Sequence, residues 1–498
     1  MSISLSSAFL TFYALCLGFG ILRRGHLGRK TIVKMADERQ KISMLESTHQ
    51  PTINVILLLP LLREQPMLEG LLDAIDALTF PTERLLVVPI TTEVESANSE
   101  QRAKAAQMVR ADLQSGSFGW KKIWIHSSHF SVSLLRQWAN TFDRDPVTVL
   151  GEIDTYVHQA DTRQTLQTML RDRHTNKVFR HVHYPHRAGN KASQMNYALD
   201  MLRKEGHISE AVSTYIGVYD ADSRPPPSSL LALSVAANQD RAAAFQQYPI
   251  YLGDVDESGY FMNSEAWLQT AHSVCVEIPR QLSVNSAITA NKRFGSTFTY
   301  CIGHGEFLRA DWLLNVQFPE KPPIDDLPTG IMLSLAQQRI VPLPIFDLCG
   351  VPHSIFDLFR QTANWFLAQS DYQGPFERAK SFGLVPPLRR IRCVIEQLIT
   401  NIGWAGRGVF RVTVLISAIN TLAWPLLLLI VLLFFIEAMV YWNITRKLID
   451  SQQDWAGLPR LPFRYSSITR PFLQSIGPCL SLYRQVMRRK SIVYKTER

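Results

Sequence analysis

Two aspartates separated by one residue are the strongest chemical signal in the sequence. Asp220 and Asp222 follow residues 212–219, which include an apolar run typical of a buried strand. Open α/β sheets bind ligands at the carboxyl ends of their strands, and two carboxylates at this spacing can converge on one hard divalent cation. An ordinary solvated turn is the alternative for the pattern taken alone. The position after a strand favours a Mg²⁺ or Mn²⁺ site at these two residues.

Strands and helices alternate around this pair. Residues 53–59 and 84–90 are apolar runs typical of buried strands, whereas 64–78 and 190–203 read as helices. The alternation predicts an α/β domain with a mostly parallel sheet. Residues 94–180 are polar and weakly patterned, and we interpret them as a helical insertion.

Several further motifs, in a fixed order, resemble those of the family-2 glycosyltransferases. These are inverting enzymes with the GT-A fold, a nucleotide-binding α/β domain. The matching segments cover about residues 50–370, and the last is similar to the Q-x-x-R-W box of the polysaccharide-synthase-like members. They are INVILLLPLLRE (53–64), HRAGNKASQMNYAL (186–199), VYDADSRPPP (218–227), YCIGHGEFLRADWL (300–313), IDDLPTG (324–330) and QTANW (361–365). The resemblance implies a GT-A nucleotide-diphospho-sugar transferase domain over 50–380.

The resemblance also implies a role for each matched residue. Asp326 is the expected general base, which takes the proton of the acceptor hydroxyl. A divalent cation on Asp220 and Asp222 would neutralise the departing nucleoside diphosphate. The residues expected to bind the donor are Pro60, Glu64, Thr92, Lys191 and Asp220. The residues expected at the donor and acceptor box are Asp325, Gln361, Asn364 and Trp365.

Simpler structural roles remain open for some of these residues. Asp325 and Asp326 could instead form the N-cap of a helix, because they directly precede Leu327. Lys191 could be a solvated residue at a helix start, and Trp365 a core aromatic. His304, between two glycines, could approach the donor or be a satisfied loop histidine.

Two departures from the family pattern limit what the resemblance implies. The second strand ends in VVPITTEVE (87–95) without paired acids, so Thr91, Thr92 or Glu93 must hold the nucleotide base. Asn364 stands where the Q-x-x-R-W box has arginine, so the charge that arginine would hold near the diphosphate is missing. This departure weakens the case for processive polymer synthesis.

The N-terminal apolar block predicts a membrane helix. Residues 3–22 carry no charge and are long enough to cross a bilayer, so we expect a transmembrane helix within 1–24. Positive charges follow the block, which disfavours a cleaved signal peptide and places the following chain in the cytoplasm.

The C-terminal apolar block predicts a membrane hairpin. Pro425 near the middle of 409–442 indicates two short spans within 407–443, with one long tilted helix as the alternative. Glu437 in the second span is either a functional carboxylate or an interfacial one. We expect an interfacial helix at 385–406, and a basic cytoplasmic tail at 444–498 that contains another.

Composition agrees with a membrane enzyme. The chain has 498 residues and a net charge of +9, and its positive residues gather after the first apolar block and in the tail. No basic run with interleaved aromatics indicates nucleic-acid binding. The six cysteines show no metal-ligand spacing, so we expect free thiols and no disulfide.

These observations predict a multi-pass membrane glycosyltransferase of inverting type, with its catalytic domain in the cytoplasm. The expected donor is a UDP-linked hexose or N-acetylhexosamine, and the expected acceptor a lipid-linked molecule or a glycan. A processive polysaccharide synthase is the alternative: the 361–365 box favours it, but about three spans are few for an export channel. A catalytically inactive membrane scaffold is the third hypothesis, which the presence of all three acids disfavours. The sequence assigns no oligomeric state.

Overall fold

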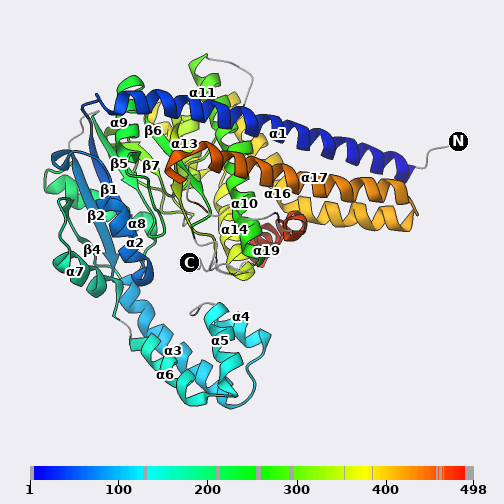
Figure 1. Cartoon of the computed structure of the whole chain (residues 1–498), viewed down its shortest axis with the longest axis horizontal. Coiled ribbons are helices and arrows are strands. Elements are labelled where there is room, and N and C mark those ends of the chain that lie inside the picture. The colour runs from blue at the N-terminus through cyan, green and yellow to red at the C-terminus, as the bar shows by residue number, and fades with distance from the viewer. Residues whose placement is uncertain are drawn as a thin grey trace.

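Figure 1 shows a helix-covered sheet from which three long helices extend together to the right, while a smaller helical lobe lies below the sheet. The structure is a computed structural model. It describes residues 5–487 except 127–129, 131, 159, 209–212, 254–259, 291–295, 323, 353, 384, 456–457, 459–462 and 464.

One mixed sheet organises the domain, with strand order β3-β2-β1-β5-β7-β6-β8 and with β4 also paired to β2. Most pairings between the described strands are parallel, and β7 is antiparallel to both of its neighbours. The strands are β1 (Asn54–Pro60), β2 (Leu85–Thr92), β3 (Val178–Phe179), β4 (Val182–Tyr184), β5 (Thr214–Val218), β6 (Ala244–Ile250), β7 (Glu306–Arg309) and β8 (Ile340–Leu348). The expected mostly parallel α/β sheet is confirmed.

Helices cover both faces of the sheet, and the apolar run of β1 shows why. Ile56 packs into a core with Met195 of α8 (Lys191–Lys204) and with α13 (Asp326–Leu335). Leu57 points the other way, into a core with Leu72 of α2 (Leu68–Asp76) and Leu233 of α9 (Ser229–Gln239). Because successive side chains of a strand alternate between faces, a strand buried on both sides must be apolar throughout.

The segment at 94–180 forms a lobe with a core of its own. Val109, Phe130, Trp138 and Ile153 are buried together. The helices of the lobe are α3 (Val94–Gln114), α4 (Trp120–His126), α5 (Val132–Phe142) and α6 (Pro146–His158). The next helix, α7 (Thr162–Asp172), packs into the core of the main domain through Leu166. The segment is not helical to its end, because β3 joins the edge of the main sheet beside β2.

Among the described residues, three helices are long and apolar enough to cross a membrane: α1 (Leu5–Glu46), α16 (Pro387–Asn420) and α17 (Trp424–Ser451). In Figure 1 they run side by side. Helix α1 does not stop near residue 24, because its second half continues as a helix that buries Ile32, Met35 and Ile42 against the domain.

The C-terminal helices also differ from the expected boundaries. Residues 385–406 make no separate helix, since α16 runs unbroken from Pro387 to Asn420. Pro425 lies in the first turn of α17, where its missing N–H breaks no helical hydrogen bond. The expected helix near 470–490 is split into α18 (Arg470–Leu473) and α19 (Ile476–Val486), and the basic end of the tail, 488–498, lies outside the described residues.

The remaining helices belong to the domain, and some of them pack against helices of the C-terminal part of the chain. They are α10 (Tyr260–His272), a π-helical segment (Ser273–Glu277), α11 (Ile278–Thr289), α12 (Ala310–Val316), α14 (Ile355–Gln369) and α15 (Gly374–Ala379). Helix α10 packs against α17, and α14 packs against α19.

Candidate active site

The two aspartates of the 220–222 motif lie directly beyond the carboxyl end of β5. Asp220 is half-buried, and its Oδ1 accepts a hydrogen bond from Lys191 Nζ at 2.8 Å. Asp222 is buried, and its Oδ2 lies 3.3 Å from the backbone N of Gly350. The motif therefore stands at the sheet edge where α/β domains bind ligands.

Lys191 is positioned by the start of α8. Asn190 caps this helix, and its side chain accepts from Ser193 N at 3.0 Å. Lys191 Nζ also donates to the backbone O of Gly303 at 2.5 Å. The lysine is therefore not a free solvated side chain, because it links the Asp220 loop to the Gly303 loop.

Asp326 meets this link from the other side, at the first turn of α13. A Cβ placed on Gly303 would lie 3.0 Å from Asp326 Oδ2 and 3.3 Å from Lys191 Nζ. A Cβ on Gly330 would lie 2.2 Å from the backbone N of Cys301, so only glycine lets α13 come this close to the 300–305 loop. The structure thus places Asp326, the expected base, and Lys191 next to the same residue, Gly303.

The helix-capping alternative for the two acids is met only in part. Asp325 occupies the N-cap position of α13, but its side chain makes no capping hydrogen bond. Asp326 Oδ1 accepts from Leu327 N at 2.7 Å, and its other oxygen faces Gly303. Asp326 therefore has one oxygen held by the helix and one directed at the site.

Buried acids surround Lys191. Burial and the charge of Asp325 raise the pKa of Asp326 to about 7, although the charge of Lys191 opposes both. Burial would lower the pKa of Lys191, but the charges of Asp220 and Asp325 outweigh it and raise that pKa. The lysine therefore stays charged, whereas Asp326 exchanges its proton near neutral pH.

Glu306 of β7 is a fourth acid that the sequence reasoning missed. It is fully buried, and neither carboxylate oxygen has a hydrogen-bond partner. Burial and the charge of Asp325 raise its pKa well above the usual range. An acid inside a strand flanked by apolar residues, in GEFLR, was the available signal.

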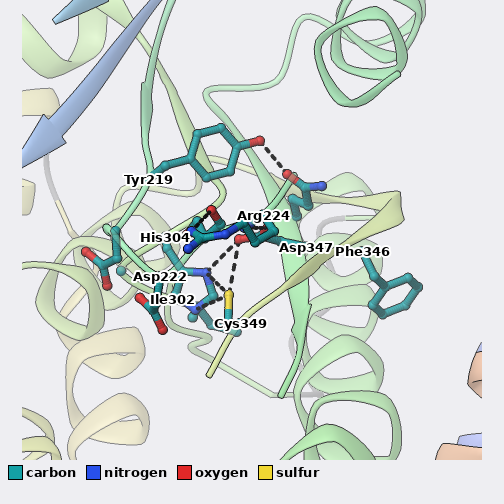
Figure 2. Close-up of polar contacts among 12 residues, drawn as sticks. Tyr219, Asp222, Arg224, Ile302, His304, Phe346, Asp347 and Cys349 are labelled. Atoms are coloured by element: carbon teal, nitrogen blue, oxygen red, sulfur yellow. Dashed lines mark hydrogen bonds and ion pairs between the residues drawn. The ribbon is translucent and has the colours of Figure 1, made fainter. Parts of the chain in front are cut away.

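His304 is a satisfied buried histidine. Its Nδ1 lies 3.2 Å from Asp347 Oδ2 and 3.3 Å from Cys349 Sγ, and the thiol also donates to Asp347 Oδ2 at 3.2 Å. Figure 2 shows this cluster with Asp222 beside it. The three side chains have the types and closeness of metal ligands, but their mutual hydrogen bonds already satisfy them. No local sequence pattern indicates this cluster, because His304 is far along the chain from Asp347 and Cys349.

The expected donor residues on β1 and β2 lie at the same sheet edge as Asp220. Pro60 ends β1, and Thr92 ends β2, where its Oγ1 accepts from Val94 N at 3.1 Å. The backbone N of Glu64 donates to Thr162 Oγ1 at 3.2 Å. Another residue missed from the sequence, Glu95, ties the loop after β1 to the helical lobe. It accepts from Arg63 N, Gln65 Nε2 and Thr162 N at 3.2, 2.9 and 3.1 Å.

A cavity of about 250 Å³ opens on the other side of Asp326. Asp326 and Trp365 line it together, so the expected base and the expected sugar-binding aromatic face one space. Gln361 and Asn364 lie on α14 with Trp365 but do not line the cavity. Of the three residues expected to act in the box, only Trp365 therefore reaches the cavity, with Thr362 beside it.

The family comparison agrees with this geometry. Residues 215–444 match the family model described as "Glycosyl transferase family group 2". The match supports a family-2-like glycosyltransferase. It begins in β5 and ends within α17, so it includes Asp220, Asp222, Asp326 and Trp365. No curated protein sequence matches the chain.

Solved structures with similar chain traces are distant from this glycosyltransferase. The mannosyltransferase PcManGT from Pyrobaculum calidifontis, in complex with GDP-Man and Mn²⁺, has 10% sequence identity and a TM-score of 0.42, covering 96% of this chain and all of its own. The S. aureus TarS 1–349 structure has 10% identity and a TM-score of 0.36, covering 87% of this chain and 92% of its own. The TarS 1–349 complex with UDP-GlcNAc gives the same values. At these scores the likeness carries no argument about function.

Proposed function

We propose that the chain is a membrane-bound inverting glycosyltransferase, with Asp326 as general base and with Asp220 and Asp222 as ligands of a divalent cation. The observation that carries the proposal is the junction at Gly303. Lys191 Nζ contacts both Asp220 and the Gly303 carbonyl, while Asp326 Oδ2 faces the same glycine. A single in-line displacement needs the base and the leaving-group side in one site, on opposite sides of the anomeric carbon.

The proton step follows from the environment of Asp326. An acceptor hydroxyl in the cavity gives its proton to the Asp326 carboxylate as its oxygen bonds to the anomeric carbon of the donor. The bond from that carbon to the diphosphate breaks, and the nucleoside diphosphate leaves. A base is most effective when its pKa lies near the operating pH, and the pKa of about 7 meets this condition.

The leaving-group side fits a hard cation. Asp220 and Asp222 offer carboxylate oxygens at the sheet edge, which are the ligands that Mg²⁺ and Mn²⁺ prefer. When bound, such a cation neutralises charge on the diphosphate. Lys191, held 2.8 Å from Asp220 Oδ1, adds a fixed positive charge there. We propose a UDP-linked hexose or N-acetylhexosamine as donor, with Pro60, Glu64 and Thr92 near the nucleotide.

Transfer of one or a few sugars is favoured over polymer synthesis. The cavity of about 250 Å³ is below the usual range of ligand pockets, roughly 300–1,000 Å³, and suits a small headgroup better than a growing chain. Asn364 supplies no charge and does not line the cavity. Gln361 does not line the cavity either, so it does not position a polymer within this space.

We further propose that α1, α16 and α17 span the membrane, with the domain in the cytoplasm. Lys41 is well exposed on the domain side of α1 and offers a test site. A cysteine in its place, in a chain whose exposed Cys16 and Cys479 are replaced by serine, should react with an impermeant maleimide only after the cells are opened. Reaction in intact cells would contradict this orientation.

Nucleoside diphosphate release is the test of the function. The purified full chain in lipid nanodiscs, given Mg²⁺ or Mn²⁺, should release diphosphate from one class of nucleotide sugar. Asp326→Asn should reduce release by about a hundredfold or more, as expected for loss of a general base. The matched control Asp143→Asn, at an exposed turn, should not. If no donor were turned over faster by the parent than by Asp326→Asn, the proposal would fail.

A further inference from the structure

The cavity beside Asp326 lies between the catalytic domain and the membrane helices. Asp326 of α13 lines its domain side, and Trp404 and Arg407 of α16 line its membrane side. Arg280 of α11 and Arg470 of α18 complete its walls. A molecule in this cavity therefore touches the proposed base at one end and a membrane helix at the other.

Positive charge gathers at the membrane end. Glu437 of α17 binds Arg24 of α1 at 2.6 Å and Arg411 of α16 at 2.8 Å. Arg24 and Arg411 share this one carboxylate, and Arg407 lies one helical turn before Arg411, so the region carries an excess of positive charge. The role of Glu437, a carboxylate within the second expected span, is therefore to form ion pairs that join the three helices.

The cavity itself has cations that lack ionic partners. Arg470 is bound by Glu265 at 2.5 and 2.6 Å and is therefore compensated. Arg280 lies over the Phe298 ring, and Arg407 donates only to Gln474 at 3.3 Å. Within the described part of the chain, no carboxylate lies at ion-pair distance from Arg280 or Arg407. Both guanidinium groups are available to an anionic ligand.

Uncharged groups in the cavity also lack partners. Gln269 Oε1 and Gln369 Nε2 are buried without hydrogen bonds, one an acceptor and the other a donor. Trp365 and Trp404 add aromatic faces. Glu277 lines the same space, and burial raises its pKa to about 7, so its carboxyl offsets only part of the positive charge. Hydroxyl groups of a polyol or sugar would satisfy both glutamines.

The helices that wall the cavity present apolar faces outward. Along the first half of α16, exposed apolar residues recur at helical spacing: Leu388, Ile391, Ile395, Leu398, Ile399 and Ile402. Helix α19, which follows α18 in the chain but does not line the cavity, exposes Leu482 and Val486 in the same way. Such faces suit helices lying at the bilayer surface, so a lipid tail would find apolar surroundings just outside the cavity.

We propose that this cavity holds the acceptor, and that the acceptor is a lipid whose phosphate carries a sugar or polyol headgroup. This inference rests on the proposed function. Arg280 and Arg407 bind the phosphate, and a headgroup hydroxyl lies at Asp326. In transfer, the hydroxyl oxygen bonds to the anomeric carbon, its proton goes to Asp326, and the nucleoside diphosphate departs.

Binding of defined probes tests this assignment. The full chain, in nanodiscs of phosphatidylcholine, is titrated calorimetrically with dioctanoyl phosphatidylinositol and with farnesyl phosphoryl glucose. These probes separate a glycerol lipid from an isoprenoid lipid. A neutral dioctanoyl glucosyl glycerol and soluble inositol phosphate are the comparison ligands. At least one phosphate lipid should bind about tenfold or more tightly than either of these, because charge-assisted hydrogen bonds are added.

Arginine variants locate the binding. Arg280→Gln and Arg407→Gln should each weaken the phosphate lipid about tenfold or more, and Arg407→Lys should restore part of the loss. Arg446→Gln, on the exposed side of α17, is the matched control and should change little. The lysine variant keeps the test valid if a glutamine variant folds poorly.

Three results would overturn the assignment. These are equal binding of the neutral lipid, equal binding of inositol phosphate, and unchanged affinity in both glutamine variants. Diphosphate release measured on the same samples separates the two proposals. Release without phosphate-lipid binding rejects the lipid acceptor alone, whereas absence of release from every nucleotide sugar rejects the transferase itself.

Discussion

Replacing Asp326 with asparagine should stabilise the protein at alkaline pH while it abolishes transfer. Burial raises the pKa of this carboxyl from 3.8 to about 7. Each tenfold change in proton affinity is worth ~1.4 kcal/mol, so ionising Asp326 costs the folded state roughly 4 kcal/mol above neutral pH. Asparagine carries no charge and still offers an oxygen to the Leu327 N–H, so it avoids this cost.

The sign of the effect gives the assay. The folded state keeps the proton of Asp326 up to about pH 7 and the unfolded state loses it near pH 4, so this carboxyl lowers stability as pH rises between those values. The melting temperature of Asp326→Asn in detergent should therefore exceed that of the parent by a few degrees at about pH 8 and match it at about pH 4.

The control for this experiment is Asp143→Asn, which changes an exposed carboxylate and should leave the parent's melting curve unchanged at both pH values. Equal melting of Asp326→Asn and parent at about pH 8 would refute the reasoning. It would mean that the carboxyl ionises without cost and is not desolvated as the structure indicates.

Three further predictions follow from particular contacts. First, kcat/KM for transfer should fall about tenfold for each pH unit below about pH 7, because the base is then protonated. A value of kcat/KM that stays constant down to about pH 5 would contradict this. Second, Glu437→Gln should cost about 3–5 kcal/mol of stability, measured by thermal unfolding in detergent, because it leaves Arg24 and Arg411 without their counter-charge. Third, Gly330→Ala should abolish turnover, because its Cβ would lie 2.2 Å from backbone, whereas Gly151→Ala on α6, with nothing within 4 Å, should retain activity.

The sheet could be predicted from the sequence because its strands are buried on both faces. Runs such as 53–59 must be apolar throughout, and a continuous apolar run is easily distinguished from the periodic apolar pattern of an amphipathic helix. Helix ends were harder to place. Helix α1 continues past residue 24 because Met35 and Ile42 pack on the domain, and this tertiary contact leaves no local mark. The sequence predicts a helix break at Pro425, and the structure places this residue in the first turn of α17, where proline is favoured.

The site was predictable where chemistry requires a fixed residue type at a strand or helix end. Asp220, Lys191 and Asp326 meet because each ends or begins an element of the same sheet edge. Glu306 and Arg407 were missed because their importance comes from what surrounds them. A buried acid and an uncompensated arginine are recognised only when burial and neighbours are known.

The affinity of the Asp326→Asn variant for the donor tests the central claim most directly, when compared with that of Asp222→Ala. We predict that Asp326→Asn binds the nucleotide sugar, with Mg²⁺ or Mn²⁺ present, as tightly as the parent while its turnover is lost. Asp222→Ala should lose the cation-dependent part of that binding. Normal turnover in Asp326→Asn, or donor binding in Asp222→Ala that still depends on the cation as in the parent, would contradict the assignment of base and metal ligand.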